Sequence, residues 1–83
     1  MEEFLRAEEI IMADKPNLSN TILLQFYSLS RQALKGDNLT PEPSFYYVIE
    51  KAKWKAWKAL AGMSQEEAKT QFFALVRATF PQF

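Results

Sequence analysis

Four lysines and two tryptophans crowd into residues 51–58, KAKWKAWK, and one of these lysines is placed where it could hold an anion. On a helix turning about 100° per residue, three of the lysines share one polar arc. Lys53 falls on the opposite, apolar arc, between Leu60 and Trp57. Its stem either covers apolar surface while the ammonium reaches water, or the ammonium serves as an anion site inside a groove. Periodicity alone favours the first interpretation. The spacing of Trp54 and Trp57 is typical of core packing.

A second cation, Arg31, lies beside an apolar stripe in residues 20–34, the segment before the glycine- and proline-containing stretch of residues 36–44. The stripe passes from leucine to phenol to guanidinium over about two helical turns, which a helix of period 3.6 places on one side. Its members and close neighbours are Leu23, Leu24, Tyr27, Ser30 and Arg31. The other face carries a conventional core stripe, so this helix is apolar over more of its circumference than one core contact requires. Either a neighbouring helix or a ligand covers the second side.

Together these features indicate a binding site for an amphiphilic ligand with an anionic head. Reactive groups for other chemistry are scarce, because the chain has no cysteine and no histidine. That composition removes thiol nucleophiles, imidazole bases and the usual zinc ligands. Glu66 and Glu67 lie in a capping turn, where interaction with the helix dipole accounts for them. We therefore expect a protein that is not an enzyme and that uses no metal and no cofactor.

Four helices must position these residues. Breaks at Pro16, residues 36–44, Gly62 and Pro81 separate four segments, and none of them shows sustained alternation of apolar and polar residues. The predicted helices cover about residues 3–13, residues 20–34 with a cap at Ser19 or Asn20, residues 47–61, and a last segment that begins after the capping box of Ser64 and Glu67. The pattern predicts an all-α four-helix domain with one longer connection.

The composition limits the setting of this domain. A chain of 83 residues holds one small domain, and its apolar runs are far shorter than the roughly 18–20 residues of a membrane-spanning helix. We therefore expect a soluble protein, without a secretory leader, located in the cytoplasm. Ten basic and ten acidic residues balance, which argues against a general nucleic-acid binder.

Three segments, in this order and separation, resemble the acyl-CoA-binding protein (ACBP) family: LLQFYSLSRQALKGD (23–37), PEPSF (41–45) and KAKWKAWKALAGMS (51–64). The resemblance implies an up-and-down four-helix bundle of the acyl-CoA-binding protein type, with one acyl-CoA-binding domain over residues 1–83. It also implies non-catalytic binding and intracellular transport or buffering of long-chain fatty acyl-CoA esters. Such a carrier is expected to be a monomer that makes transient contacts with acyl-CoA-using enzymes or membranes.

The resemblance further implies roles for individual residues. Tyr27, Arg31 and Lys53 match the tyrosine and the two basic residues that hold the 3′-phosphate of coenzyme A in the family. Arg31 replaces the more usual lysine and retains the charge, with a fork suited to phosphate. Leu23 and Leu24 match positions that line the groove for the acyl chain.

At other site positions the chain departs from the family pattern. Phe72 stands where a tyrosine is usual, and Ser30 replaces a tyrosine that usually packs near the adenine. Met12 and Ile49 occupy positions where lysines are common contacts. These changes deplete the nucleotide end of the predicted site and enlarge its apolar part. An alternative function is therefore a diverged helical interaction module that binds a protein or a plain lipid, with weak or no recognition of coenzyme A.

Overall fold

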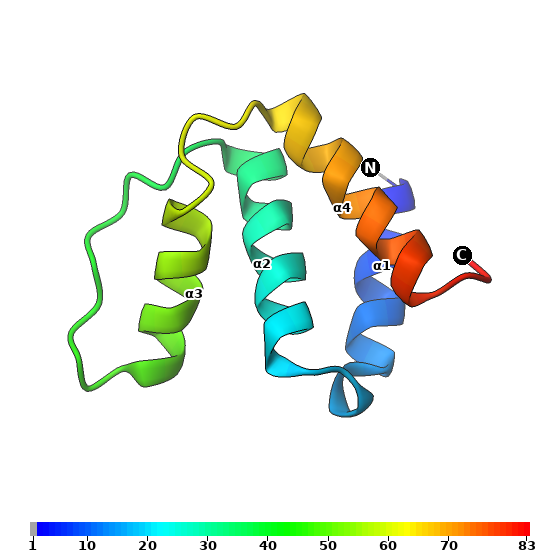
Figure 1. Ribbon diagram of the computed structural model, residues 1–83, viewed down its shortest axis with the longest axis horizontal. Helices are drawn as coiled ribbons and strands as arrows, with labels where there is room; N and C mark the ends of the chain where they lie inside the picture. Colours follow the sequence, from blue (N-terminus) through cyan, green and yellow to red (C-terminus); the bar gives the residue numbers. More distant parts are fainter. Residues whose placement is uncertain (1) are drawn as a thin grey trace.

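The computed structural model describes residues 2–83, and the secondary-structure elements of this part of the chain are all helices (Figure 1). The predicted all-α class is therefore confirmed. The elements are α1 (Glu2–Ala13), a short 3-10 helix η1 (Lys15–Asn17), α2 (Asn20–Lys35), α3 (Val48–Lys58) and α4 (Gln65–Thr79). None of the helices in the described range is long and apolar enough to cross a membrane.

Serine side chains fix where two of the helices begin. The Ser19 hydroxyl accepts a hydrogen bond from the Ile22 amide at 3.2 Å, at the start of α2. The Ser64 hydroxyl accepts one from the Glu67 amide at 3.0 Å, at the start of α4. Each bond satisfies an amide that has no partner within its helix. Of the two caps predicted for α2, Ser19 is the one used.

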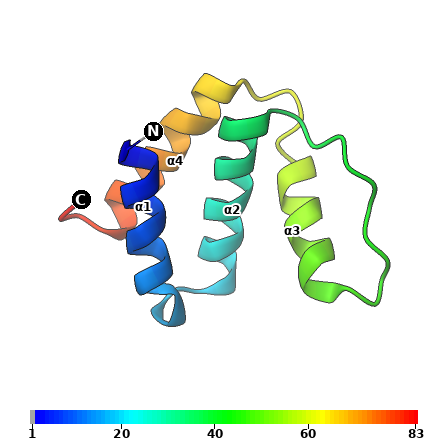
Figure 2. The ribbon, with the colours of Figure 1, turned by 180° about the vertical axis from the view of Figure 1, so that it is seen from behind.

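The helices do not alternate strictly in direction. Figure 1 and Figure 2 show α2 in the middle, with α1 and α4 on one side and α3 on the other. The long connection of residues 36–47 carries the chain back along the molecule, so α3 runs parallel to α2 while α1 and α4 run the opposite way. The parallel pair brings α2 residues beside α3 residues along their lengths.

An aromatic core joins α1, α2 and α4. Phe4 stacks on Phe72 with ring centroids 4.5 Å apart and planes 2° apart, and Phe26 meets Phe72 edge-on at 5.8 Å. Such pairs stabilise a core beyond the area they bury. The remaining buried members of the cluster are Ala7, Ile11, Leu29, Phe73, Val76 and Phe80. One face of α1 and one face of α4 thus meet α2 in this core.

The two tryptophans of α3 differ in burial: Trp57 is buried, as its spacing predicts, whereas Trp54 is only partly buried. Neither belongs to the main core cluster. The Trp57 indole donates to the Gly36 carbonyl at 2.8 Å, and the Trp54 indole donates to the Thr40 carbonyl at 2.9 Å. Both rings thus fasten the connection of residues 36–47 onto α3, because an indole N–H requires a polar partner when its ring is covered.

Two of the lysines on α3 hold the same connection. Lys51 pairs with Glu42 at 3.3 Å, and the Lys58 ammonium donates to the Asn38 carbonyl at 3.3 Å. Lys55 is exposed, as its polar arc predicts. The amide group of the buried Asn38 side chain donates to the Trp54 carbonyl at 3.2 Å, so here the donor belongs to the connection and the acceptor to α3.

The third helix ends three residues earlier than the pattern predicts, at Lys58 rather than at residue 61. Gly62 adopts a φ of 91°, a conformation that glycine tolerates without steric cost. Its amide donates to the Asp37 carboxylate at 3.0 Å, and the Gln32 amide group donates to the same oxygen at 2.9 Å. These bonds hold the turn after α3 against the end of α2. The hydrogen bond from the Gly62 amide, and to a smaller extent the one from Gln32, lower the pKa of Asp37 below its ordinary value.

Candidate functional site

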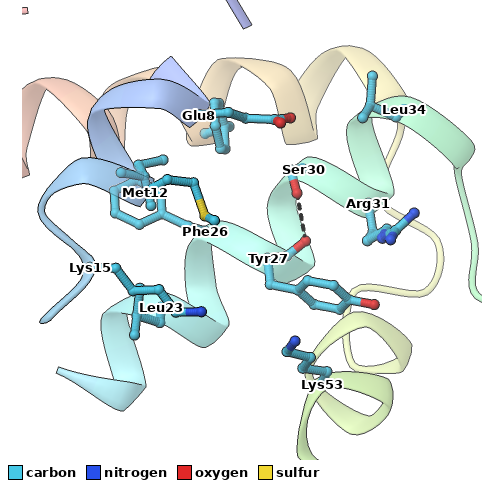
Figure 3. A pocket seen from close by; sticks show the side chains of 12 residues that line it. Glu8, Met12, Lys15, Leu23, Phe26, Tyr27, Ser30, Arg31, Leu34 and Lys53 are labelled. Carbon is cyan, nitrogen blue, oxygen red and sulfur yellow. Dashed lines mark hydrogen bonds between the residues drawn. The ribbon is translucent and has the colours of Figure 1, made fainter. Parts of the chain in front are cut away.

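Tyr27 lies between two cations that come from different helices. The Lys53 ammonium of α3 and the Arg31 guanidinium of α2 are each 5.3 Å from the centroid of the Tyr27 ring (Figure 3). These distances are typical of cation–π contacts. Lys53 is thus directed at α2 and its ammonium lies beside the phenol, in a groove between two helices. This placement favours the anion-site interpretation of a lysine on an apolar arc.

Both cations retain hydrogen-bonding capacity. Neither forms an ion pair within the described residues, where the ion pair observed is that of Lys51 with Glu42. Their side chains are only partly exposed. A phosphate entering this position would therefore meet an arginine fork, a lysine ammonium and a phenol, and charge-assisted hydrogen bonds are the strong kind.

These cations border a cavity of about 400 Å³ that opens between α1, α2 and α3. Seven of the nine predicted site residues line it: Met12, Leu23, Tyr27, Ser30, Arg31, Lys53 and Phe72. Ile11, Phe26 and Leu34 add apolar surface to its wall. The cavity therefore combines an apolar wall with a cationic border, which is the arrangement an anionic amphiphile requires.

Phe72 and Ser30 contribute in restricted ways. Phe72 is only 1% exposed and its ring is stacked on Phe4, so it forms part of the floor of the cavity. The Ser30 hydroxyl donates to the Tyr27 carbonyl at 2.8 Å within the helix (Figure 3). Its donor is already used, and its oxygen can still accept a hydrogen bond from a ligand.

Two predicted residues lie outside the lining of this cavity. Leu24 is partly buried on α2, and Ile49 is 67% exposed in the first turn of α3. Ile49 precedes Lys53 by one helical turn, so it shares that residue's side of α3. Contact of Leu24 and Ile49 with a ligand stays a prediction.

The cavity also includes two charged residues that the sequence did not single out. Glu8 and Lys15 both line it, beside Met12. Glu8 and Met12 are four residues apart on α1, so they share one helical face, and Lys15 follows in η1. Since Met12 was a predicted site residue, this spacing was a signal that Glu8 also belongs to the site. In Figure 3 the Glu8 side chain extends over the cavity above Ser30.

The charges of the lining leave a positive balance. Lys15, Arg31 and Lys53 outnumber the one carboxylate of Glu8. The groups present can bind and orient an anion and cover an apolar chain. The described residues contain no group of three potential metal ligands among histidine, cysteine and the acidic residues.

Comparison with known proteins places the chain in a family. The family described as Acyl CoA binding protein matches residues 1–76. The chain belongs to the acyl-CoA-binding protein family. The resemblance seen in the three sequence segments is thereby confirmed.

Individual acyl-CoA-binding proteins are also similar in sequence to this family member. Acyl-CoA-binding protein homolog 3 of Caenorhabditis elegans is 44% identical over 62 residues, which span 75% of this chain and 53% of that relative. Acyl-CoA-binding protein homolog 1 of the same nematode is 35% identical over 69 residues, which span 83% of this chain and 80% of that relative. The chain thus spans about half the length of homolog 3.

A solved structure confirms the fold. The crystal structure of Oryza sativa Acyl-CoA-Binding Protein 2 superimposes with a TM-score of 0.87 at 32% sequence identity. The match covers 98% of this chain and 90% of the rice chain. The arrangement of helices around the cavity is therefore that of the acyl-CoA-binding protein fold.

Proposed function

We propose that the chain binds long-chain fatty acyl-CoA esters without reacting them, and that it carries or buffers these esters in the cytoplasm. Residues 1–83 then constitute one acyl-CoA-binding domain that acts as a monomer. The observation that carries this proposal is the pair of cations, Arg31 and Lys53, at Tyr27 beside an apolar cavity. Membership of the family supports the ligand class.

The two parts of the ligand would use different parts of the site. The 3′-phosphate of coenzyme A would bind Tyr27, Arg31 and Lys53 through charge-assisted hydrogen bonds, worth about 1.5–3 kcal/mol each. The acyl chain would lie on apolar side chains such as Leu23, where each buried methylene contributes about 0.8 kcal/mol. Neither part suffices alone, because association itself costs several kcal/mol.

A second candidate function rests on the lining residues Glu8 and Met12. A carboxylate in the cavity repels phosphate, and a methionine stands where the family commonly has a lysine. A plain lipid, with less negative charge than a coenzyme A ester, would tolerate both residues. The domain would then be a lipid-binding module with weak recognition of coenzyme A.

The experiment is a calorimetric comparison of hexadecanoyl-CoA with its 3′-dephospho form. If Tyr27, Arg31 and Lys53 hold the 3′-phosphate, the dephospho thioester binds more weakly, and added salt reduces the difference because the cations are partly exposed. Equal affinities that do not change with salt would reject this phosphate site. Tight binding of hexadecanoate in the same series would favour the plain-lipid alternative.

A further inference from the structure

Five consecutive apolar residues, Phe45–Ile49, lie exposed where the long connection enters α3. We call this stretch, FYYVI, the apolar corner. Its side chains are between 59% and 77% exposed. Isolated apolar residues on a surface are ordinary, whereas a contiguous exposed patch marks an interaction site. None of the five residues lines the cavity, and a ligand contact is predicted for Ile49 alone, so ligand binding does not account for the stretch as a whole.

Backbone hydrogen bonds and a ring stack connect the apolar corner to its neighbours. The rings of Phe45 and Tyr46 stack with centroids 4.3 Å apart. The Tyr47 amide donates to the Ser44 carbonyl at 3.0 Å, and the Tyr47 carbonyl accepts from the Lys51 amide at 2.8 Å as α3 begins. A partner would therefore meet a formed surface, and little conformational freedom would be lost on contact.

The charge distribution indicates what that partner is. The α3 helix carries four lysines and one glutamate, while α1 carries four glutamates and one arginine. These helices lie on opposite sides of α2 in both views (Figure 1, Figure 2). The α3 helix is thus net positive and α1 is net negative, while beside the apolar corner itself Glu50 starts α3 and Lys51 is paired with Glu42. An anionic surface would attract the lysine-bearing side and turn the acidic side away.

The residue types of the apolar corner suit a lipid interface. Tyrosine places an apolar ring among acyl chains and a hydroxyl among headgroups, and it is enriched where membranes meet water. A symmetric contact between two copies would instead bring the lysines of two α3 helices together, and like charges repel. Of the two acidic residues of the connection, Glu42 is paired with Lys51, and Asp37 accepts hydrogen bonds from Gly62 and Gln32.

We infer that the apolar corner docks on the surface of a lipid bilayer containing anionic lipids, with the lysines of α3 directing the approach. This surface is separate from the cavity. The inference therefore stands whether or not the cavity binds acyl-CoA. Docking would place the start of α3 near the lipid while leaving the acidic α1, on the other side of α2, in water.

The test measures binding to vesicles of phosphatidylcholine with and without phosphatidylserine, by flotation. The intact protein should bind the anionic vesicles and release them in high salt. The double variant Tyr46→Ser with Val48→Ser should bind roughly tenfold more weakly or worse, because two exposed apolar side chains are removed. The matched control Leu5→Ser changes an apolar residue that is 59% exposed on the acidic helix α1, and it should bind like the intact protein.

The helical circular dichroism spectrum of each variant is compared with that of the intact protein, so that a loss of binding caused by unfolding is recognised. Phe45→Ser, which changes only the connection, provides a second variant that leaves the residues of α3 intact. The inference is overturned if the intact protein binds neither kind of vesicle, or if the double variant binds as well as the intact protein. Sedimentation velocity showing dimers that the double variant abolishes would assign the apolar corner to a second copy and overturn the lipid assignment.

Discussion

The Lys53 ammonium lies 5.3 Å from the centre of the Tyr27 ring, and this contact joins α3 to α2 at the edge of the cavity. Other lysines on the same helix are used differently. Lys51 and Lys58 hold the connection of residues 36–47, and Lys55 is exposed. One short run of lysines therefore divides between a structural role, a solvated position and a border of the cavity.

Replacing Lys53 by alanine should weaken binding of hexadecanoyl-CoA by about 1.5–3 kcal/mol, since one charge-assisted hydrogen bond is lost. Lys55→Ala, two positions along the same helix and exposed, serves as the matched control and should change the affinity little. Calorimetric titration of both variants gives the comparison. Equal losses in the two variants would show that general attraction to the lysines, and not the position beside Tyr27, determines binding.

Glu8 should oppose the binding of an anionic ligand. Its carboxylate lines the cavity but is exposed, so Glu8→Gln should tighten binding of hexadecanoyl-CoA by about 0.2–1 kcal/mol, the scale of exposed charge interactions. Glu9→Gln removes a neighbouring exposed carboxylate that does not line the cavity, and it should have a smaller effect. Titrations at low and high salt measure both variants. Unchanged affinity in Glu8→Gln at low salt would mean that Glu8 does not face the bound anion.

A cation can be restored at two positions where the family commonly has lysine. Met12 lines the cavity, whereas Ile49 lies outside its lining. Met12→Lys should therefore tighten nucleotide binding by about 0.2–1 kcal/mol, while Ile49→Lys should do less. The measurement is the affinity of each variant for hexadecanoyl-CoA. A larger gain from Ile49→Lys would show that the bound nucleotide extends beyond the cavity toward the start of α3.

Helix class and core faces could be predicted because they depend on local periodicity and capping. Phe4, Ala7 and Ile11 repeat at helical spacing and are buried, and Ser64 caps the helix that follows it. Lys53 could be selected because a charge on an apolar arc is a local anomaly. The family resemblance then supplied Met12 and Phe72, which periodicity alone would have left as an exposed residue and a core residue.

Long-range relationships could not be predicted in the same way. The parallel course of α3 depends on the connection of residues 36–47, whose bonds to Trp54 and Trp57 join groups 14 and 21 residues apart. Spacing alone therefore predicted the burial observed for Trp57 but not the hydrogen bonds that both rings donate to the connection. Glu8 and Lys15 belong to the site because α1 packs beside α2, and helical periodicity within one segment contains no such information.

Asp37 should stabilise the domain only when it is ionised. Hydrogen bonds from Gly62 and Gln32 lower its pKa in the folded protein, so its contribution is present above the ordinary value of 3.8 and is lost as the pH falls through the lower folded pKa. Asp37→Asn should therefore lower the Tm at neutral pH, and the difference should vanish in acid well below that value. Thermal unfolding followed by circular dichroism across this range measures it. A Tm difference that does not depend on pH would contradict a role for the charge.

The central claim is that one cavity binds both the nucleotide and the acyl chain of an acyl-CoA ester. Calorimetric titration of the intact protein with free coenzyme A, and then with hexadecanoyl-CoA, tests it most directly. Since each buried methylene contributes about 0.8 kcal/mol, the thioester should bind more than about a hundredfold more tightly than free coenzyme A. Equal affinities for the two compounds, or no binding of the thioester, would contradict the account.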